Sequence, residues 1–286
     1  MQIVSRIHEM QNLANSLRAE GKRIGVVPTM GYLHAGHLSL IGLARQHSDQ
    51  VITTLFVNPT QFGPGEDFER YPRDFQRDQN SAARAGTDIL FAPETSDMYS
   101  AGHETSVEVE RVSSILEGKF RPTHFRGVAT IVTKLFNITK PHVAVFGQKD
   151  AQQAFLIKKL AADLNFDLEI LVAPTVREQD GLALSSRNSY LSSEERPRAA
   201  ALYRSLKQAE ALIARGERSA ATVRDQMMEI LTRAEPTQID YVAFVQPDSF
   251  SEVETLVPPA VLVALAARFG PTRLIDNMTI PIPSSK

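Results

Sequence analysis

The strongest constraint on the fold is an alternation of short β-rich runs and helical patterns over roughly the first 175 residues. The strand-like runs lie at residues 24–27, 51–57, 89–92, 143–146 and 168–172. The helical patterns lie at residues 37–47, 71–85, 125–138 and 150–164. This alternation predicts a parallel sheet that is covered by helices on both faces and connected by right-handed crossovers. Ligands bind beyond the carboxyl ends of such strands, so the loops that follow the strands are the candidate sites.

The pattern changes after about residue 174. Two helical stretches follow, at residues 193–215 and 220–234, and then strand-like runs at 240–245 and 261–266. We therefore expect a Rossmann-like, doubly wound α/β domain over residues 1–175 and a smaller C-terminal α+β domain over residues 176–286. A chain of 286 residues is long enough for these two domains.

Composition narrows the class of function. The chain carries 31 Lys and Arg against 33 Asp and Glu, with no basic stripe, which argues against nucleic-acid binding. It has no cysteine, which excludes disulfides, thiolate nucleophiles and cysteine-ligated zinc. The first 21 residues lack the apolar core of a signal peptide, and the apolar run at 260–267 is too short to span a bilayer. We expect a cytoplasmic enzyme that acts on small molecules.

The most informative loop reads PTMGYLHAGHL and occupies residues 28–38, between a strand and a helix. Gly31 and Gly36 have the spacing of a P-loop, but His37 replaces its lysine and Leu38 replaces its serine or threonine. His34 and His37 instead flank a glycine at a helix N-terminus, where both imidazoles can donate to one triphosphate. The alternative is that the histidines only cap the helix, but two of them around a glycine favour binding.

Three further loops carry polar side chains that suit the same chemistry. The loop NPTQFGPGED at 58–67 offers the amides of Asn58 and Gln61, which can bind hydroxyls and carboxylates without adding charge. Lys149, after a strand and a glycine, can reach a phosphate as a point charge. The run LSSRN at 184–188 places two hydroxyls beside the guanidinium of Arg187. Each of these loops, taken alone, is also compatible with an ordinary turn or a helix cap, and for the Lys149 loop a cap by Asp150 is narrowly favoured.

Together the motifs resemble the pantothenate synthetase (pantoate–β-alanine ligase) family, which belongs to the HIGH-motif nucleotidyltransferases. The resemblance runs almost end to end, through PTMGYLHAGH, FVNPTQFGPGEDFERYPRD, RPTHFRGV, FGQKDAQQ, PTVREQDGLALSSRN and DYVAF. It implies that ATP and pantoate form pantoyl adenylate and pyrophosphate, and that β-alanine then displaces AMP to give pantothenate. It also implies Mg²⁺, a homodimer that pairs through the N-terminal domains, and a C-terminal domain that acts as a lid.

The resemblance also implies roles for individual residues. His37 matches the proton-donor histidine of the family, and His34, Lys149 and Arg187 complete the predicted catalytic set. Gln61 and Gln153 match the glutamines that bind pantoate, with Gln61 also near β-alanine, and Asn58 and Tyr71 line the same region. The predicted ATP-binding residues are Met30, Gly31, Tyr32, Leu33, His34, Ala35, Gly36, His37, Gly147, Gln148, Lys149, Asp150, Val176, Leu184, Ser185, Ser186 and Arg187.

A few departures and rival interpretations remain. Ala35, Gln148 and Leu184 stand where many relatives have Glu, Glu and Met, and none of these is a side chain that the chemistry requires. Another nucleotidyltransferase of the superfamily would lack the Gln61 and Gln153 pair. A non-catalytic nucleotide-binding module would tolerate loss of His37 or Lys149. A metal hydrolase built on His34 and His37 lacks a nearby carboxylate at ligand spacing. The sequence does not indicate the magnesium ligands.

Overall fold

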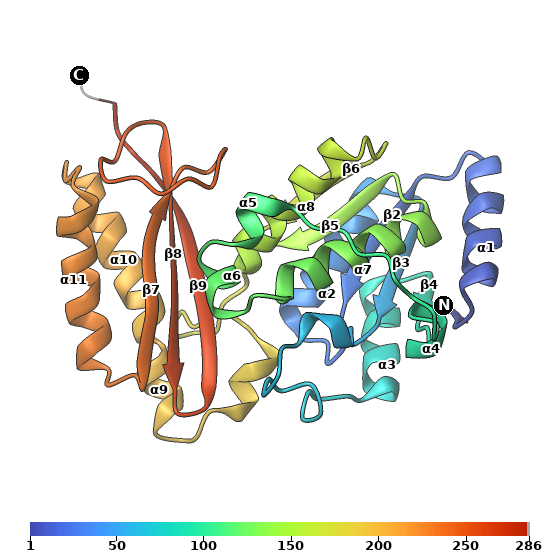
Figure 1. Ribbon diagram of the computed structural model, residues 1–286, viewed down its shortest axis with the longest axis horizontal. Helices are drawn as coiled ribbons and strands as arrows, with labels where there is room; N and C mark the ends of the chain where they lie inside the picture. Colours follow the sequence, from blue (N-terminus) through green and yellow to red (C-terminus); the bar gives the residue numbers. More distant parts are fainter. Residues whose placement is uncertain (285–286) are drawn as a thin grey trace. The chain divides into compact units, whose positions relative to one another are not determined.

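The computed structural model describes residues 1–284 and divides into two compact units. The first unit comprises Met1–Gln148 and Gln152–Pro174, and the second comprises Lys149–Ala151 and Thr175–Lys286. Figure 1 shows both units, with labels on their helices and strands where there is room. Each unit is described by itself below.

The first unit is built on six parallel strands in the order β1-β4-β3-β2-β5-β6. These strands are β1 Gln2–Val4, β2 Ile24–Thr29, β3 Gln50–Leu55, β4 Ile89–Phe91, β5 Val143–Gly147 and β6 Glu169–Ala173. The long helices are α1 Ile7–Ala19, α2 Ala35–His47, α3 Phe75–Ala85, α7 His124–Thr139 and α8 Ala151–Asp163. Shorter helices are α4 Thr95–Met98, α5 Glu110–Ser113, α6 Glu117–Phe120 and the 3₁₀ turns η1 Pro59–Gln61 and η2 Gln148–Asp150.

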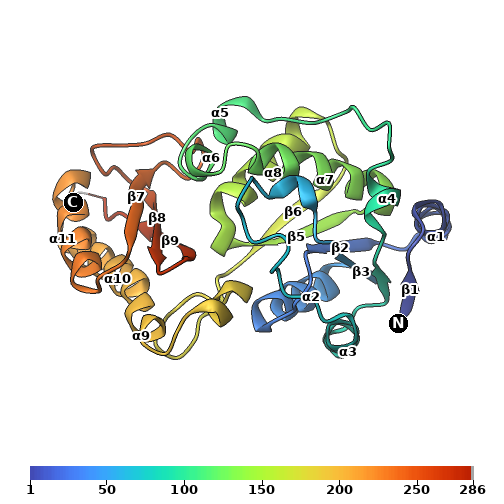
Figure 2. The ribbon, with the colours of Figure 1, turned by 60° about the horizontal axis from the view of Figure 1, so that its bottom comes forward.

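Helices cover both faces of this sheet. Figure 2 shows α2 and α3 on one face and α7 and α8 on the other. The chain runs outward from β2 through β3 to β4, and then returns to β5 and β6 on the other side of β2. All crossovers between parallel strands are expected to be right-handed. A right-handed crossover towards one edge of the sheet places its helix on one face, and a crossover towards the other edge places its helix on the opposite face. This strand order therefore produces the two helical layers. The predicted doubly wound α/β fold is confirmed.

Local sequence signals explain where several elements begin and end. The predicted helix at 71–85 begins only at Phe75, because Pro72 disfavours helical backbone before it and Asp74 caps the backbone N–H of Arg77 at 3.0 Å. The helix ends at Gly86, whose φ of 103° is left-handed. The sequence pattern does not predict strand β1, which has only three residues.

The second unit contains an antiparallel sheet in the order β7-β8-β9. The strands are β7 Gln238–Val245, β8 Ala260–Phe269 and β9 Thr272–Pro281. The helical elements are η3 Ser186–Tyr190, α9 Glu195–Ala199, α10 Ala201–Ala214 and α11 Ala220–Arg233. The predicted helix at 193–215 is therefore two helices divided at Ala200, and β9 is a strand that the sequence pattern does not predict. This arrangement is the smaller α+β fold that the sequence predicts.

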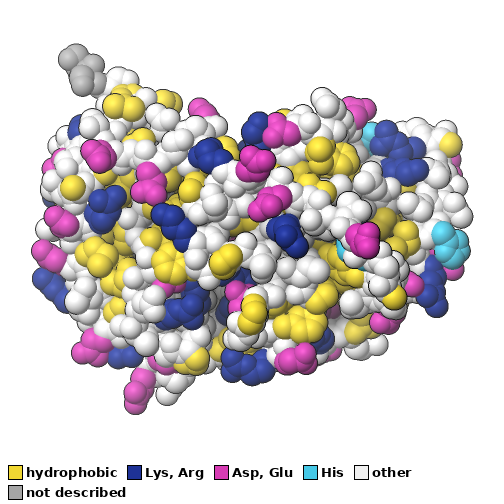
Figure 3. All heavy atoms as spheres, in the orientation of Figure 1, with side chains coloured by type: hydrophobic (Ala, Val, Ile, Leu, Met, Phe, Trp, Pro, Cys, Tyr) yellow, Lys and Arg dark blue, Asp and Glu magenta, His cyan; other side chains and the backbone are white. Residues whose placement is uncertain are grey.

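The charged side chains on the surface are mixed in sign. On the face that Figure 3 shows, Lys and Arg side chains are interspersed with Asp and Glu, and no region of one sign dominates. Among the described residues, no helix is long and apolar enough to cross a membrane.

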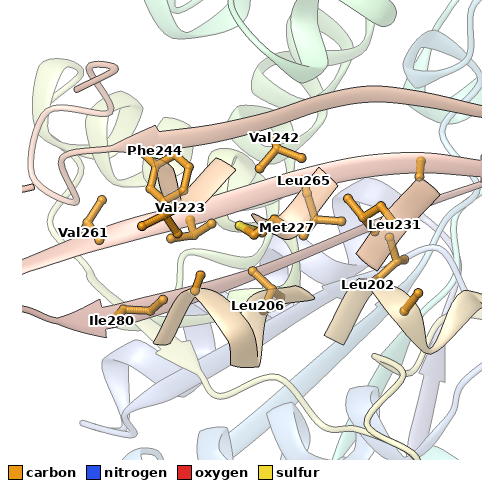
Figure 4. Packing of buried hydrophobic residues seen from close by; sticks show 14 of the residues in the cluster. Leu202, Leu206, Val223, Met227, Leu231, Val242, Phe244, Val261, Leu265 and Ile280 are labelled. Atoms are coloured by element: carbon orange, nitrogen blue, oxygen red, sulfur yellow. The ribbon is translucent and has the colours of Figure 1, made fainter. Parts of the chain in front are cut away.

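The core of the second unit lies between its sheet and helices α10 and α11. Leu206 of α10 and Met227 of α11 are fully buried against Val263 and Leu265 of β8. Figure 4 shows these helices presenting their apolar side chains to one face of the sheet. Burying a side chain of this size stabilises a fold by about 1.5–3 kcal/mol, so the layer gives this unit a core of its own.

Candidate active site

The predicted nucleotide-binding turn follows β2 and ends at His34, the N-cap of α2. Thr29, the last residue of β2, donates its hydroxyl to the backbone oxygen of Thr54 on the neighbouring strand β3 at 2.7 Å. Gly31 and Tyr32 then adopt positive φ angles of 85° and 50°. Two successive left-handed residues reverse the chain direction sharply, and glycine does so without strain. The turn thus leads directly into the N-terminus of a helix, where an anion is stabilised.

A buried carboxylate that the sequence pattern does not single out holds this turn in place. Asp78 of α3 is only 2% exposed and accepts the backbone N–H groups of Tyr32 at 2.6 Å and Leu33 at 2.7 Å. A Cβ atom at Gly31 would lie 2.9 Å from this carboxylate, so the close approach requires glycine. Burial raises the pKa of Asp78, while the hydrogen bonds from Leu33 and Tyr32 and the charge of Arg77 oppose the rise.

The neighbouring Arg77 supports the same turn from outside. Its guanidinium donates to the backbone oxygen of Leu33 at 3.2 Å and lies over the ring of Tyr32 at 4.6 Å from the centroid. A signal for Asp78 was present in the sequence. Asp78 lies on the same face of α3 as the buried residues Ser81 and Ala82. A carboxylate on a buried helix face needs hydrogen-bond donors.

His34 and His37 lie against each other at the start of α2. Their ring centroids are 4.0 Å apart, and the backbone N–H of His34 donates to Nδ1 of His37 at 3.3 Å. A Cβ at Gly36 would come within 3.0 Å of the His34 ring, which explains the glycine between them. Because Nδ1 of His37 accepts, its neutral ring carries the proton on Nε2. Nε2 is therefore the donor nitrogen of this histidine.

Asn58 and Gln61 occupy the turn after β3 and are held by a buried polar network. Asn58 is fully buried and Gln61 is 8% exposed. The side-chain nitrogen of Asn58 donates to Oε1 of Gln61 and to the backbone oxygen of Gly127, both at 3.1 Å. Its oxygen accepts from the hydroxyls of Tyr99 at 2.8 Å and Thr60 at 3.0 Å. Both ends of the Asn58 amide thus hydrogen-bond to protein groups, and the bond to Oε1 fixes the position of the Gln61 side chain.

The motif RPTHFRGV supplies further supports for the Gln61 turn. Arg121 donates to the backbone oxygen of Gln61 at 3.1 Å and makes two hydrogen bonds of 2.7 Å to Glu66. Nδ1 of His124 lies 3.0 Å from the same oxygen of Gln61. A Cβ at Gly127 would lie only 2.3 Å from a backbone oxygen of the turn. The sequence alone gives the residues of this motif no role, and the structure shows that they position the turn.

Tyr71, which we expected near the pantoate-binding region, is 5% exposed. Its ring lies 5.9 Å from that of Phe62 in an edge-on arrangement. It therefore packs within the loop that follows Gln61.

The two glutamines at the start of α8 differ in environment. Gln152 is 6% exposed; it donates to the backbone oxygens of Val112 and Ile115, both at 2.8 Å, and accepts the backbone N–H of Glu117 at 3.1 Å. Gln153, the predicted pantoate-binding residue, is half-buried on the next position of the helix. Gln152 therefore has a structural role, whereas Gln153 is the more exposed of the two amides.

Lys149 lies in the 3₁₀ turn η2, which comes directly after Gly147 at the end of β5. Its Nζ is 3.2 Å from Oδ1 of Asp150. Its backbone oxygen accepts a hydrogen bond of 2.8 Å from the side-chain amide of Asn277 on β9. Both Lys149 and Asn277 belong to the second unit, so a strand of that unit fixes the peptide of the predicted phosphate-binding lysine.

The turn at 176–188 is anchored to the same strand. Arg177 makes two hydrogen bonds to Asp276 on β9, at 2.6 and 2.9 Å, and donates to the backbone oxygen of Gly181 at 3.0 Å. The Asp276 side chain is fully buried. Burial raises the pKa of Asp276, and the adjacent Arg177 opposes that rise. Neighbouring positions of β9 therefore anchor the Lys149 turn and this one.

The predicted phosphate-binding run begins where that turn closes. The backbone N–H of Leu184 donates to the backbone oxygen of Val176 at 3.0 Å, which brings these two predicted ATP-binding residues together. Ser185 accepts the backbone N–H of Arg187 at 3.3 Å and so caps η3. Asn188 donates to the backbone oxygen of Ala183 at 3.1 Å. The run from Ser185 to Arg187 is therefore a short, capped turn.

The structure brings the predicted residues into two groups. The first unit holds Met30, Gly31, Tyr32, Leu33, His34, Ala35, Gly36, His37, Gln61, Gly147, Gln148 and Gln153. Strands β3, β2 and β5 are neighbours and run parallel, so the His34 turn, the Gln61 turn and Gly147 leave from one edge of the sheet. The second unit holds Lys149, Asp150, Val176, Leu184, Ser185, Ser186 and Arg187. Within residues 1–284, no group of three or more His, Asp or Glu side chains is placed to hold a metal ion.

Comparison with known proteins identifies the family. The model of the pantoate-beta-alanine ligase family matches residues 2–279. The chain belongs to this family.

Relatives of the pantoate–β-alanine ligase family match over nearly their whole length. Pantothenate synthetase from Acetivibrio thermocellus is 51% identical over 282 residues, which cover 99% of this chain and 100% of that protein. The enzyme from Moorella thermoacetica is 52% identical and covers 99% of each chain.

Solved structures of the family share the fold. The crystal structure of pantothenate synthetase from Thermus thermophilus matches with a TM-score of 0.92 and 43% identity, over 97% of this chain and 99% of that one. The ligase from Francisella tularensis, solved in complex with Beta-gamma ATP and beta-alanine, matches with a TM-score of 0.81 and 36% identity over 97% of each chain.

Proposed function

We propose that this protein condenses pantoate with β-alanine at the expense of ATP and releases pantothenate, AMP and pyrophosphate. The observation that carries this proposal is the arrangement of the His34–His37 turn and the Gln61 turn at the ends of neighbouring parallel strands. Membership of the pantoate–β-alanine ligase family supports the same reaction. The relative from Francisella tularensis, solved with a nucleotide and β-alanine, supports the choice of substrates.

We infer that the reaction proceeds through pantoyl adenylate. A carboxylate oxygen of pantoate attacks the α-phosphorus of ATP, and the bond from that phosphorus to the pyrophosphate oxygen breaks. The amine of β-alanine then attacks the acyl carbon, loses a proton, and AMP leaves with the electron pair of the broken C–O bond. No protein nucleophile takes part, so the barrier is lowered by positioning and by charge stabilisation.

Each predicted residue has a role in this scheme. His34 and His37 donate to the phosphates, with Nε2 of His37 as the donor that its tautomer favours. Lys149 and Arg187 balance the negative charge that gathers on the leaving pyrophosphate, and Ser185 and Ser186 donate to its oxygens. Gln61 and Gln153 hold pantoate, and Gln61 also lies beside the site of β-alanine. The remaining predicted ATP-binding residues supply backbone contacts to the nucleotide.

Magnesium is part of this proposal. Mg²⁺ is typically held by substrate phosphates, waters and one or two carboxylates, and it neutralises charge on the phosphates. The absence of a metal cluster among residues 1–284 fits an ion that arrives with the triphosphate. Asp150 supplies the carboxylate within the predicted nucleotide-binding set.

Three further features rest on the family resemblance. We propose that residues 176–286 act as a lid that excludes water from the reactive adenylate, while residues 1–175 bind ATP and pantoate. We also propose that the protein is a homodimer and works in the cytoplasm. A measurement of the molecular mass in solution tests whether the protein is a homodimer.

The decisive test of the proposed reaction is ATP–pyrophosphate exchange by the purified protein with Mg²⁺. Exchange should require pantoate and should proceed without β-alanine, because only the first half-reaction is reversed. Other small hydroxy acids serve as comparison substrates. Exchange or nucleotide transfer with a different acceptor, and none with pantoate, would overturn the proposed substrate and leave the nucleotide site in place.

A further inference from the structure

Two backbone groups determine which way the Asn58 amide points. The backbone N–H of Thr60 donates to one end of this amide at 3.4 Å, so that end is the oxygen Oδ1. The backbone oxygen of Gly127 accepts from the other end at 3.1 Å, so that end is the nitrogen Nδ2. A backbone N–H can only donate and a carbonyl can only accept, which leaves one orientation for the amide.

The orientation of Asn58 in turn sets that of Gln61. Nδ2 of Asn58 lies 3.1 Å from the Gln61 amide, and since Nδ2 is a donor its partner is the oxygen Oε1. The nitrogen Nε2 of Gln61 is then the end of the amide that serves a ligand. The Nε2 end of Gln61 therefore presents donors to the substrate, while Oε1 is already engaged by Asn58.

Tyr99 reinforces this arrangement at the oxygen end of the Asn58 amide. It follows helix α4, and its hydroxyl donates to Oδ1 of Asn58 at 2.8 Å. Burial raises the pKa of Tyr99, against the smaller effects of its hydrogen bonds to Thr60 and Asn58, so the hydroxyl keeps its proton. A phenol that stays protonated remains a donor, and Oδ1 of Asn58 remains an acceptor.

We propose that Tyr99 is a positioning residue that reinforces the hydrogen-bond polarity of the pantoate-binding region. This inference rests on the proposed function, in which Gln61 binds pantoate. Through Asn58, Tyr99 helps to hold the Gln61 amide in the orientation that directs Nε2 to a ligand oxygen. The hydroxyl and carboxylate oxygens of a hydroxy acid accept such a bond, whereas an ammonium group has no lone pair and cannot. The chain thereby favours 2-hydroxy acids over the corresponding 2-amino acids.

The test is the substitution Tyr99→Phe, which removes one hydroxyl and keeps the ring. We expect KM for pantoate to rise about fivefold, the scale of one neutral hydrogen bond, while KM for ATP stays within twofold. The 2-amino analogue of pantoate should compete better relative to pantoate in the variant, because the Gln61 amide is then less strongly fixed. Tyr241→Phe makes the same chemical change on β7 and should leave all three quantities unchanged.

The exchange assay of the wild-type protein tests the proposed function, and the kinetics of Tyr99→Phe test the role of Tyr99. If the wild-type protein shows no pantoate-dependent exchange, the proposed function fails. If the wild type shows exchange and folded Tyr99→Phe keeps the wild-type KM for pantoate and the wild-type selectivity, the inference alone is overturned. A parallel rise of KM for pantoate and ATP would indicate a general structural role and would also overturn it.

A second variant guards against misfolding of the first. Thr60→Val removes another hydroxyl donor to Oδ1 of Asn58, at 3.0 Å, and leaves the Tyr99 ring intact. If Tyr99→Phe does not fold, Thr60→Val should show the same selective rise of KM for pantoate. An unchanged KM in that variant would reject the inference.

Discussion

The carboxylate of Asp78 accepts the backbone N–H of Leu33 at 2.7 Å across 45 positions of sequence. This bond and its companion at Tyr32 link helix α3 to the turn that begins α2. The shape of the proposed nucleotide-binding turn therefore depends on a helix that follows the Gln61 loop. Substitutions in α3 are therefore expected to alter ATP binding although the substituted residues do not contact ATP.

Asp78→Asn tests this dependence. Asparagine keeps the size of the side chain but can accept only one of the two N–H groups, and its own NH₂ opposes the other. A hydrogen bond to a charged group is worth about 1.5–3 kcal/mol, so we expect kcat/KM for ATP to fall tenfold or more. Initial rates of pyrophosphate release at varied ATP measure this. Asp74→Asn is the control, since asparagine caps a helix as well as aspartate, and equal losses in both variants would contradict the prediction.

His37→Ala addresses the proposed phosphate donor directly. Removing one donor to the charge of a transition state typically lowers kcat by about 10²–10³, and we expect a loss of at least 10² in adenylate formation. Single-turnover measurement of pantoyl adenylate follows this step. His8, an exposed histidine on α1, provides the matched control His8→Ala. A rate close to wild type in His37→Ala would reject the role of Nε2.

Asn277→Ala examines how Lys149 is held. The variant loses the 2.8 Å bond to the backbone oxygen of Lys149, while the helix and sheet core of the second unit is untouched. We expect kcat/KM for ATP to fall about fivefold, with KM for pantoate unchanged. Asn80→Ala removes an exposed amide from α3 and should be neutral. If the two variants have the same kcat/KM for ATP, Asn277 does not position the lysine.

His142→Asn examines the pH dependence of stability in the first unit. Nδ1 of His142 accepts the backbone N–H of Ile24 at 3.0 Å, which requires the neutral ring. Burial lowers the pKa of His142, Arg18 and Arg23 lower it further, and Asp167 and Asp49 act in the opposite direction. The folded protein therefore binds fewer protons than the unfolded chain, whose histidine has a pKa of about 6.5.

The sign of the effect follows from this difference. The stabilising contribution of His142 is complete above about pH 6.5 and is lost as the pH falls through the lowered folded pKa. In the variant, the asparagine oxygen takes the place of Nδ1 and does not titrate. We expect Tm to drop between pH 8 and pH 5.5 by about 2 °C more in the wild type than in His142→Asn. Identical drops in thermal unfolding experiments would contradict this.

The sheet of the first unit could be predicted because its signals are local. Runs such as 51–57 are rich in β-branched residues, and turn residues bound them, so five of its strands and the helices between them are readable from periodicity. The three-residue strand β1 is stabilised by pairing with β4, which no local pattern reveals. Strand β9 was missed for a related reason, because buried charged and polar residues such as Asp276 interrupt its apolar pattern.

The same contrast between local signals and long-range contacts applies to the candidate site. His34, Gly36 and His37 lie in one short segment, and their types and spacing indicate an anion-binding turn. The residues that hold the turns, such as Asp78, Gly127 and Asn277, act over 45 to 128 positions of sequence. Their chemistry is ordinary for a helix or a strand, so only the fold shows what they contact.

The bond between Asn277 and Lys149 has a consequence for synthesis of the chain. On a ribosome, the lysine emerges 128 residues before the amide that fixes its peptide. All strands of the parallel sheet, which ends with β6 at Ala173, are available long before β9 is made. A nascent chain can therefore complete its first unit while the proposed phosphate-binding lysine is still unanchored. We therefore expect the proposed adenylate-forming reaction to reach full efficiency only after β9 has been translated.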